Sequence, residues 1–185
     1  MKSIRLSDAL VSDDILIVGL AKGAKAETLK IESGSVSLDE KSLLAALKDL
    51  GATGAANEIT KLPGSTTRLL IFTGLGEAKK DYAHEVLRRA AGAASRALAG
   101  EKSAAVALPT TSIEQVAAVA EGMTLGAYAF DEFRGSSKAE RKAPLIGATV
   151  HTKMANSAEA KAAVKRAVII GEYTKLVRDL INTPP

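Results

Sequence analysis

The chain has 185 residues, 46% hydrophobic and only 3% aromatic, and no cysteine, so we expect a core of Ala, Val, Leu and Ile and exclude disulfides, thiolate metal sites and thiol nucleophiles. The formal net charge is +4, but the basic residues are mixed with acidic ones and lack interleaved aromatics, which favours a solvated surface over a nucleic-acid groove. The N-terminus turns acidic too early for a signal peptide, and no apolar run reaches the roughly 18 residues that span a bilayer, so we expect a soluble, cytoplasmic protein.

The first half of the chain predicts strands that alternate with two helices. Ser37 and Glu40 fit a capping box, which would open a helix that Gly51 ends. This helix would carry Leu43, Leu44, Leu47 and Leu50. In chain order the prediction is strands at residues 4–6, 14–19 and 28–32, a helix over 37–50, a short strand ending at 62, a strand at 68–73 and a helix over 81–99.

The second half of the chain continues this alternation. Ser112 and Gln115 fit a second capping box, and the helix that they open should close at residues 130–134, before a charged loop. Its inward side would carry Val116, Val119, Ala120, Met123 and Ala127. The other predicted elements are strands at residues 104–108 and 145–150 and a final helix that begins near Ser157.

Strands that alternate with helices of these lengths predict an α/β fold with a mixed, largely parallel sheet flanked by helices. We expect two parts within the chain. Residues 1–156 would form the α/β domain, and residues 157–185 would form a long helix that connects this domain to another one.

The final helix carries apolar residues on two different faces. Val164 and Val168 share one face, whereas the large apolar residues from Ile169 onward centre on nearly the opposite side, with Gly171 at the crossover. Burying each of these side chains is worth roughly 1.5–3 kcal/mol, so the second set is expected to find a partner. Our hypothesis is that the first half of the helix packs on this domain and the second half docks against another body.

Two short motifs are candidates for chemistry. Gly74 and Gly76 stand between a predicted strand and a predicted helix, where backbone N–H groups can hold a phosphate. The third glycine of a dinucleotide fingerprint and the Gly-Lys-Ser/Thr of a P-loop are missing, so a tight turn is the favoured interpretation. His84 and Glu85 begin like a zinc-protease helix, but Arg88 stands where the second histidine is needed, so we interpret His84 as a surface or half-buried helix residue.

The other polar candidates lack the partners that catalysis needs. His151 has no carboxylate or second histidine near it in the sequence, and the acidic pairs at residues 13–14 and 131–132 stand at the ends of elements, where a solvated or capping role is usual. With two histidines and no cysteine, a metal site would have to be built from carboxylates. We therefore predict no catalytic, cofactor-binding or metal-binding residue in this chain.

Three stretches, in this order, resemble the N-terminal domain of the leucyl (cytosol) aminopeptidases. Gly74-Leu75-Gly76 and the Ala-rich helix at residues 88–99 are similar to the family's V-G-L-G strand and next helix. Residues 121–131 (EGMTLGAYAFD) resemble its E-G-x-x-L-x-x-Y-x-F-D stretch. Residues 177–184 (VRDLINTP) resemble the segment that joins its two domains, of the form A/V-R-D/N-L-x-N-T-P, although Pro185 stands where many members have alanine.

The resemblance implies a macro-type α/β fold and a role for this chain in assembling a hexamer, a dimer of trimers. It further implies a catalytic domain in the whole enzyme, in which two divalent ions, zinc or manganese, activate the water that releases N-terminal residues such as leucine from peptides. The motifs that hold those ions, such as N-T-D-A-E-G-R, do not occur in this sequence. We therefore carry over no catalytic or metal residue and predict the chain to be inactive alone, with its own catalytic domain as its first partner.

Two other functions stay open from the sequence. A macro-like module would recognise an ADP-ribose-type phosphate at the glycine turns of residues 19–23 and 74–76, although the macro domain's own glycine-rich loop is not recognisable. The basic surface would alternatively serve an interaction or DNA-binding role, which a salt-dependent affinity would reveal.

Overall fold

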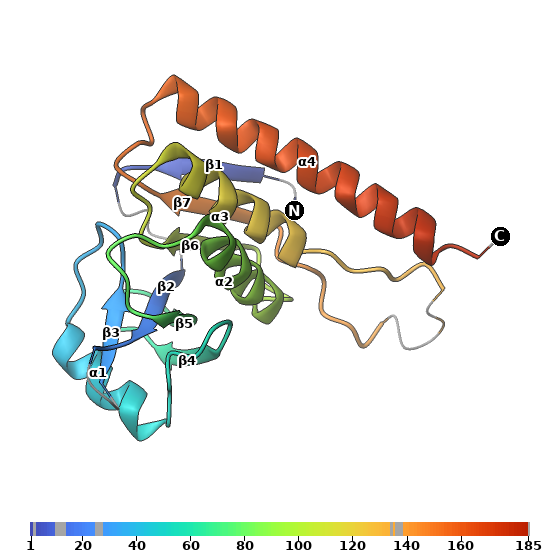
Figure 1. The fold of residues 1–185 in the computed structure, drawn as a ribbon. Helices are drawn as coiled ribbons and strands as arrows, with labels where there is room; N and C mark the ends of the chain where they lie inside the picture. The colour runs from blue at the N-terminus through green and yellow to red at the C-terminus, as the bar shows by residue number, and fades with distance from the viewer. Residues whose placement is uncertain (2, 10–13, 25–27, 134, 136–138, 185) are drawn as a thin grey trace.

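The computed structural model describes residues 1, 3–9, 14–24, 28–133, 135 and 139–184 (Figure 1). Within this part of the chain, seven strands form one mixed sheet. The strands are β1 (Ser3–Ser7), β2 (Ile15–Lys22), β3 (Leu29–Glu32), β4 (Ile59–Pro63), β5 (Leu69–Glu77), β6 (Ser103–Ala107) and β7 (Gly147–His151).

The sheet has the order β1-β7-β6-β2-β5-β4, and every neighbouring pair from β1 to β5 is parallel. β4 pairs antiparallel with β5, and β3 pairs antiparallel with β2. Parallel strands that are covered on both faces read as continuous apolar runs, and Ile15 to Ala21 of β2 are all buried. The predicted α/β fold with a mixed, largely parallel sheet is confirmed.

One edge of β2 is shared by two strands placed end to end. Leu16 to Val18 pair with β6, and Gly19 to Lys22 pair with β3. The other edge of β2 pairs with β5 along its whole length.

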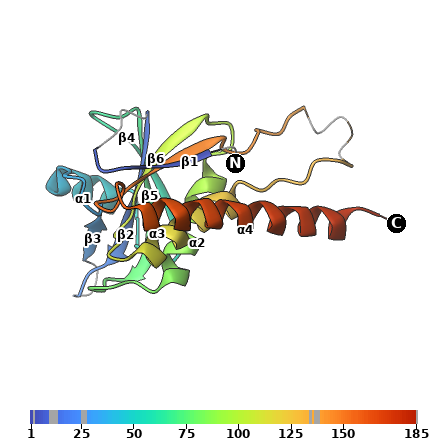
Figure 2. The same ribbon diagram turned by 90° about the horizontal axis from the view of Figure 1, so that it is seen from above.

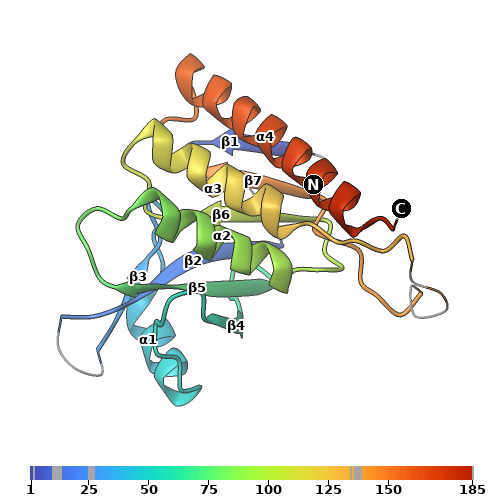
Figure 3. The same cartoon turned by 45° about the vertical axis from the view of Figure 1, so that its right-hand side comes forward.

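Among the described residues, four helices cover the two faces of the sheet: α1 (Glu40–Asp49), α2 (His84–Ala97), α3 (Ile113–Gly126) and α4 (Ala158–Asn182). α2, α3 and α4 lie side by side on one face (Figure 3), where their apolar residues join those of the sheet in the larger core. α1 lies on the other face and places Leu47 in a second, smaller core with Leu16, Val18 and Phe72. No helix in the described part of the chain is both long and apolar enough to cross a membrane.

The α2–α3 contact depends on glycines because the two backbones approach each other closely. A Cβ at Gly122 would lie 2.1 Å from the carbonyl oxygen of Arg88, and a Cβ at Gly126 would lie 2.3 Å from that of Gly92. Small residues at these positions therefore set the distance between the two helices.

The helix starts at Ser112 and Ser157 are confirmed, since each serine hydroxyl accepts a hydrogen bond from the backbone N–H three residues on. The start at Ser37 is wrong. Asp39 is the N-cap of α1, and its carboxylate accepts from the N–H of Ser42 at 3.4 Å. Asp and Ser cap helices about equally well, so the local pattern could not choose between them.

Other element ends also differ from the sequence prediction. α2 begins at His84 rather than at residue 81, and α3 ends at Gly126 rather than at residues 130–134. Ala127 is the C-cap residue of α3, and the side chain of the following Tyr128 reaches α4. Leu50, predicted to lie on this helix, is the C-cap residue of α1 and is 59% exposed. Gly51 ends α1 in the left-handed conformation (φ +71°), as predicted.

Candidate functional site

The first half of α4 is packed on the domain by small and medium residues. Ala160, Val164, Ala167 and Gly171 are the buried residues of this helix, and Val164 and Ala167 belong to the larger core. A Cβ at Gly171 would lie 2.4 Å from Cγ2 of Thr124 on α3, so glycine is what allows the two helices to touch there. The predicted packing of this half on the α/β domain is confirmed.

The second half of α4 presents an uncovered row of large apolar side chains, which we call the apolar stripe. Figure 2 shows this half of the helix running out beyond the sheet. Leu180 is 67% exposed and Ile181 is 76% exposed. The apolar stripe consists of Ile169, Ile170, Tyr173, Leu176, Val177, Leu180 and Ile181. Its face is the one that the sequence pattern placed opposite Val164 and Val168.

A polar cluster, the Tyr128 clasp, ties the second half of α4 to the chain that follows α3. The Tyr128 hydroxyl donates to Oδ1 of Asp179 at 2.8 Å and accepts from Nδ2 of Asn182 at 3.2 Å. The Arg178 guanidinium lies over the Tyr128 ring, 4.1 Å from its centroid. Desolvation, followed by the Asp179 carboxylate, raises the pKa of Tyr128, so the hydroxyl stays a donor at neutral pH.

The Tyr128 clasp joins two motifs that the sequence analysis treated separately. Tyr128 belongs to the stretch at residues 121–131, and Arg178, Asp179 and Asn182 belong to the stretch at residues 177–184. The sequence pattern did not pair them, because Tyr128 and Asp179 are 51 positions apart. In the folded chain they link α4 to the segment after α3, at a point where the apolar face of the helix is uncovered.

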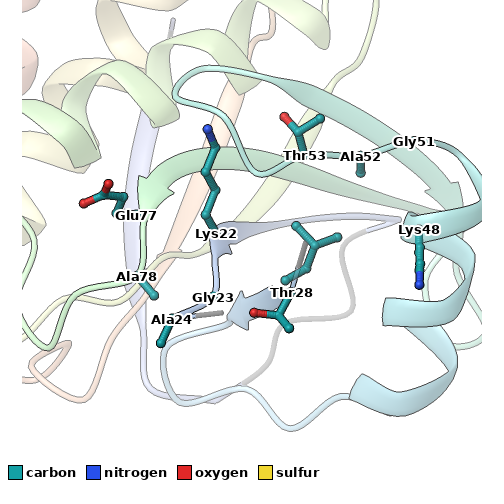
Figure 4. Close-up of a pocket in the computed structure, with 11 residues that line it drawn as sticks. Lys22, Gly23, Ala24, Thr28, Lys48, Gly51, Ala52, Thr53, Glu77 and Ala78 are labelled. Carbon is teal, nitrogen blue, oxygen red and sulfur yellow. The ribbon is translucent and has the colours of Figure 1, made fainter. Parts of the chain in front are cut away.

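A cavity of about 690 Å³ opens at the carboxyl ends of β2 and β5, on the side of α1. Figure 4 shows Lys22 and Glu77 on neighbouring strand ends, with Lys48 of α1 across the cavity. Thr28 and Thr53 add hydroxyl groups to its lining. Ligands of open α/β sheets bind outside the carboxyl ends of the strands, and two lysines with hydroxyls suit an anionic, hydroxylated molecule.

The wall of this cavity at residues 53–58 is held by one carboxylate. Glu58 accepts hydrogen bonds from the N–H groups of Thr53 and Ala55 and from the Thr53 hydroxyl, at 2.9–3.1 Å. Local charge-assisted bonds of this kind fix a loop without a hydrophobic core beneath it. The sequence predicts a loop from Gly54 onward and offers Gly23 as part of a glycine turn, but it did not indicate that these segments and Lys48 line one cavity.

The expected glycine turn at Gly74 and Gly76 is wrong, because both residues lie inside β5. The N–H of Gly74 donates to Glu58 and its carbonyl accepts from Asn57, while the N–H of Gly76 donates to Gly54. A Cβ at Gly74 would lie 1.7 Å from the carbonyl oxygen of Ala55. The glycines thus let residues 54–58 cross over β5, and these two N–H groups are not available to a phosphate.

The second glycine turn considered from the sequence, residues 19–23, lies partly inside a strand and partly at the cavity. Gly19 lies inside β2 against Leu75, whereas Gly23 borders the cavity and donates its N–H to the carbonyl of Thr28 at 2.7 Å. Only the end of this stretch therefore reaches a candidate ligand site.

His84 is the first residue of α2 and is exposed. Arg88, which replaces the second histidine of a zinc motif, contacts Glu85 and donates to Glu121 at 2.7 Å. Arg88 lowers the pKa of the Glu85 carboxyl, so this group of side chains is an ion-pair network between α2 and α3. The interpretation of His84 as a helix residue without a metal partner fits this geometry.

His151 is buried at the end of β7, and the fold gives it partners that the sequence did not indicate. Its Nδ1 lies 3.1 Å from the Ser35 hydroxyl, and the backbone of Asp8 hydrogen-bonds the ring. Burial lowers the pKa of His151 below its ordinary value, while Asp8 acts in the opposite direction. No carboxylate side chain hydrogen-bonds this imidazole in the described part of the chain, so its neighbours do not make it a general base.

The acidic pairs do not form a metal site in the described residues. Asp131 pairs with Arg141, Glu132 is exposed, and Asp14 is exposed at the start of β2, whereas Asp13 lies outside the described residues. Within the described ranges, no group of three or more His, Asp or Glu residues could hold a metal ion. The donor set does not fit a two-metal centre, and we assign no metal ligand to this chain.

Comparison with known proteins supports the resemblance seen in the sequence. Residues 17–137 match the N-terminal domain of the cytosol aminopeptidase family. A probable cytosol aminopeptidase of Streptomyces avermitilis is 40% identical over 204 residues, which cover 100% of this chain and 40% of that protein. One of Streptomyces griseus is 43% identical, over 96% of this chain and 38% of that protein. The chain thus spans about 40% of the length of these curated relatives.

Solved structures show the same fold at lower identity. A tomato leucine aminopeptidase variant superposes with a TM-score of 0.70 and 23% identity, over 100% of this chain and 39% of that one. The bottromycin maturation enzyme BotP gives a TM-score of 0.66 and 23% identity, over 93% of this chain and 33% of that one. With the sequence matches above, these likenesses lead to one conclusion: the chain belongs to the cytosol aminopeptidase family and corresponds to its N-terminal domain.

Proposed function

We propose that this chain is the non-catalytic N-terminal domain of a cytoplasmic leucyl aminopeptidase, and that the apolar stripe of α4 docks on a catalytic domain that follows it. The observation that carries the proposal is the uncovered stripe on a helix whose other half is already packed. The curated relatives support it, because they are more than twice as long as the part that this chain matches.

In this proposal the two parts of the chain, residues 1–156 and 157–185, have different roles. The α/β domain supplies a rigid base, and α4 carries the next domain at a fixed direction set by the Tyr128 clasp. The whole enzyme would be a hexamer that releases N-terminal residues such as leucine from peptides with the help of two zinc or manganese ions. This chain would contribute to assembly, and peptide substrates would reach the enzyme only through the other domain.

The first test is enzymatic. The purified 185-residue chain should not hydrolyse leucine p-nitroanilide with manganese, with zinc or with neither. Its described residues offer no metal site, and the family's metal motifs are not in its sequence. Hydrolysis by the pure chain that a chelator stops would contradict the proposal.

The second test concerns docking and uses the chain followed by its catalytic domain. The double variant Leu176→Glu and Leu180→Glu places charges in the apolar stripe, whereas the control Arg166→Glu changes an exposed residue elsewhere on α4. We expect the double variant to become sensitive to proteolysis near residue 183 and to lose hexamer in sedimentation. Equal behaviour of the double variant and the control would exclude docking through the stripe.

A macro-like ligand module is the second candidate, and the cavity at the ends of β2 and β5 is what favours it. Its volume and its lining by Lys22 and Lys48 suit an ADP-ribose-type phosphate. Calorimetry with ADP-ribose should then show saturable micromolar binding that Lys22→Ala weakens and that Lys41→Ala, an exposed lysine outside the cavity, leaves unchanged. Without saturable binding this candidate is dismissed.

A further inference from the structure

The outer edge of β1 is open in the described part of the chain, because β1 pairs only with β7. The carbonyl of Ser7 accepts from the N–H of Thr152 at 2.9 Å, on the β7 side. Main-chain groups alternate in direction along a strand, so the N–H and C=O groups of Ile4 and Leu6 point to the open side. An open edge of this kind is a template for another strand.

A groove of about 540 Å³ runs beside this edge, between β1 and the first half of α4. Its apolar lining residues come from both elements: Ile4, Leu6, Val164, Val168 and Ile169. The groove ends at Ile169, the first residue of the apolar stripe, but its lining belongs to the packed half of the helix. The groove and the stripe proposed to receive the catalytic domain therefore meet at Ile169, and the other lining residues of the groove are not part of the stripe.

The charges around the groove all have the same sign. Its lining includes Arg5, Lys161 and Lys165 and no carboxylate. These three side chains are exposed, and in the described residues none of them forms an ion pair. Arg5 points to the sheet face opposite Ile4 and Leu6, whereas Lys161 and Lys165 lie on α4. A strand added to the edge would meet cations on both of its faces.

We propose that the outer edge of β1 binds an extended, acidic segment of another protein, which joins the sheet as an additional strand. Main-chain hydrogen bonds to Ile4 and Leu6 would hold the segment, apolar residues would fill the groove, and carboxylates would pair with Arg5, Lys161 and Lys165. A second copy of this chain does not fit, because pairing β1 with β1 brings the two cationic sets together. A nucleic acid does not fit either, because the groove is apolar and contains no aromatic residue for stacking.

The direct test is fluorescence anisotropy with a labelled peptide in which Glu and Val alternate, added to the 185-residue chain. We expect saturable binding, and at least about tenfold weaker binding of the same peptide with Lys in place of Glu. The triple variant R5E/K161E/K165E should reverse this preference. The control K41E/K80E/K102E changes three exposed lysines outside the groove and should leave it unchanged.

A second measurement, on the unmodified chain, tests whether the peptide pairs with the open edge of β1. Hydrogen exchange should slow at the amides of Ile4 and Leu6 when the acidic peptide binds, and should stay the same at Arg5 and Ser7, which face β7. Binding without this alternating protection would overturn strand addition. Equal affinity for the two peptides, dimerisation of the free chain through β1, or preferential binding of duplex DNA that the triple variant abolishes would overturn the proposal as well.

Discussion

The two halves of α4 belong to one continuous helix, yet the fold treats them in opposite ways. The half before Gly171 is held by close packing of small residues on α3, whereas the half after it is held by polar contacts, the Tyr128 clasp and an ion pair between the Met1 amine and Glu172. Close packing fixes a helix in position, because a contact made by glycine leaves no room for movement. These polar contacts leave the large apolar residues of the stripe uncovered, so they stay available for a partner.

The largest expected effect tests whether the two halves of α4 are packed differently, by placing one charge in each half. Val164→Asp buries a carboxylate in the core and should lower the free energy of unfolding by about 3 kcal/mol or more. Leu180→Asp, at an exposed position, should change it by less than about 0.5 kcal/mol. Urea denaturation of both variants is the measurement, and equal losses would show that the second half is packed after all.

The next effect is steric. Gly171→Val drives a side chain into Thr124, and overpacking of this kind costs about 1–3 kcal/mol. Ala162→Val introduces the same β-branched side chain at an exposed position of the same helix and should cost about 0.5 kcal/mol. Urea unfolding that ranks the two variants equally would remove Gly171 as the point of close contact.

A smaller effect is expected at the Tyr128 clasp. Tyr128→Phe removes the hydroxyl between Asp179 and Asn182 but keeps the ring under Arg178, so both hydrogen bonds of the clasp are lost. Hydrogen exchange should accelerate at residues 172–182 and not at residues 158–171. Tyr173→Phe, whose hydroxyl is on the exposed stripe, is the matched control and should leave both segments unchanged.

The smallest expected effect concerns how the free energy of unfolding depends on pH. It should come from His151, which is buried at the end of β7. Burial holds the pKa of His151 below the ordinary value of 6.5, so the unfolded chain binds a proton first as the pH falls. The contribution of His151 to the free energy of unfolding should be fully present above pH 6.5 and should decline as the pH falls below it. Urea midpoints measured across this range should lose part of their slope in His151→Gln, and an unchanged slope would mean that other groups cause it.

The sequence predicted those parts of the fold whose signal is local. Ile15 to Gly19 read as a covered strand because both faces are buried, and Ser112 and Ser157 cap helices through their own hydroxyls. The uncovered face of α4 was also visible in the sequence, since helical periodicity needs no knowledge of the rest of the chain.

The parts that could not be predicted depend on distant segments. Gly74 is needed because Ala55 crosses above it, which no pattern around Gly74 records. His151 is hydrogen-bonded to Ser35, 116 positions away, so its neighbours in sequence were uninformative. The cavity at the ends of β2 and β5 likewise exists only once the strands are assembled.

The shared edge of β2 has a consequence for the order in which the sheet assembles. β3 follows β2 after a short connection, so closing that hairpin costs little chain entropy, whereas β6 must arrive from more distant sequence. We expect the β2–β3 pair to form first and to act as a stop, so that β6 can zip along β2 only as far as Val18. Pulsed hydrogen exchange during refolding should then protect the amide of Ala21, which faces β3, before that of Ala107, which faces β2, and the reverse order would contradict this sequence of events.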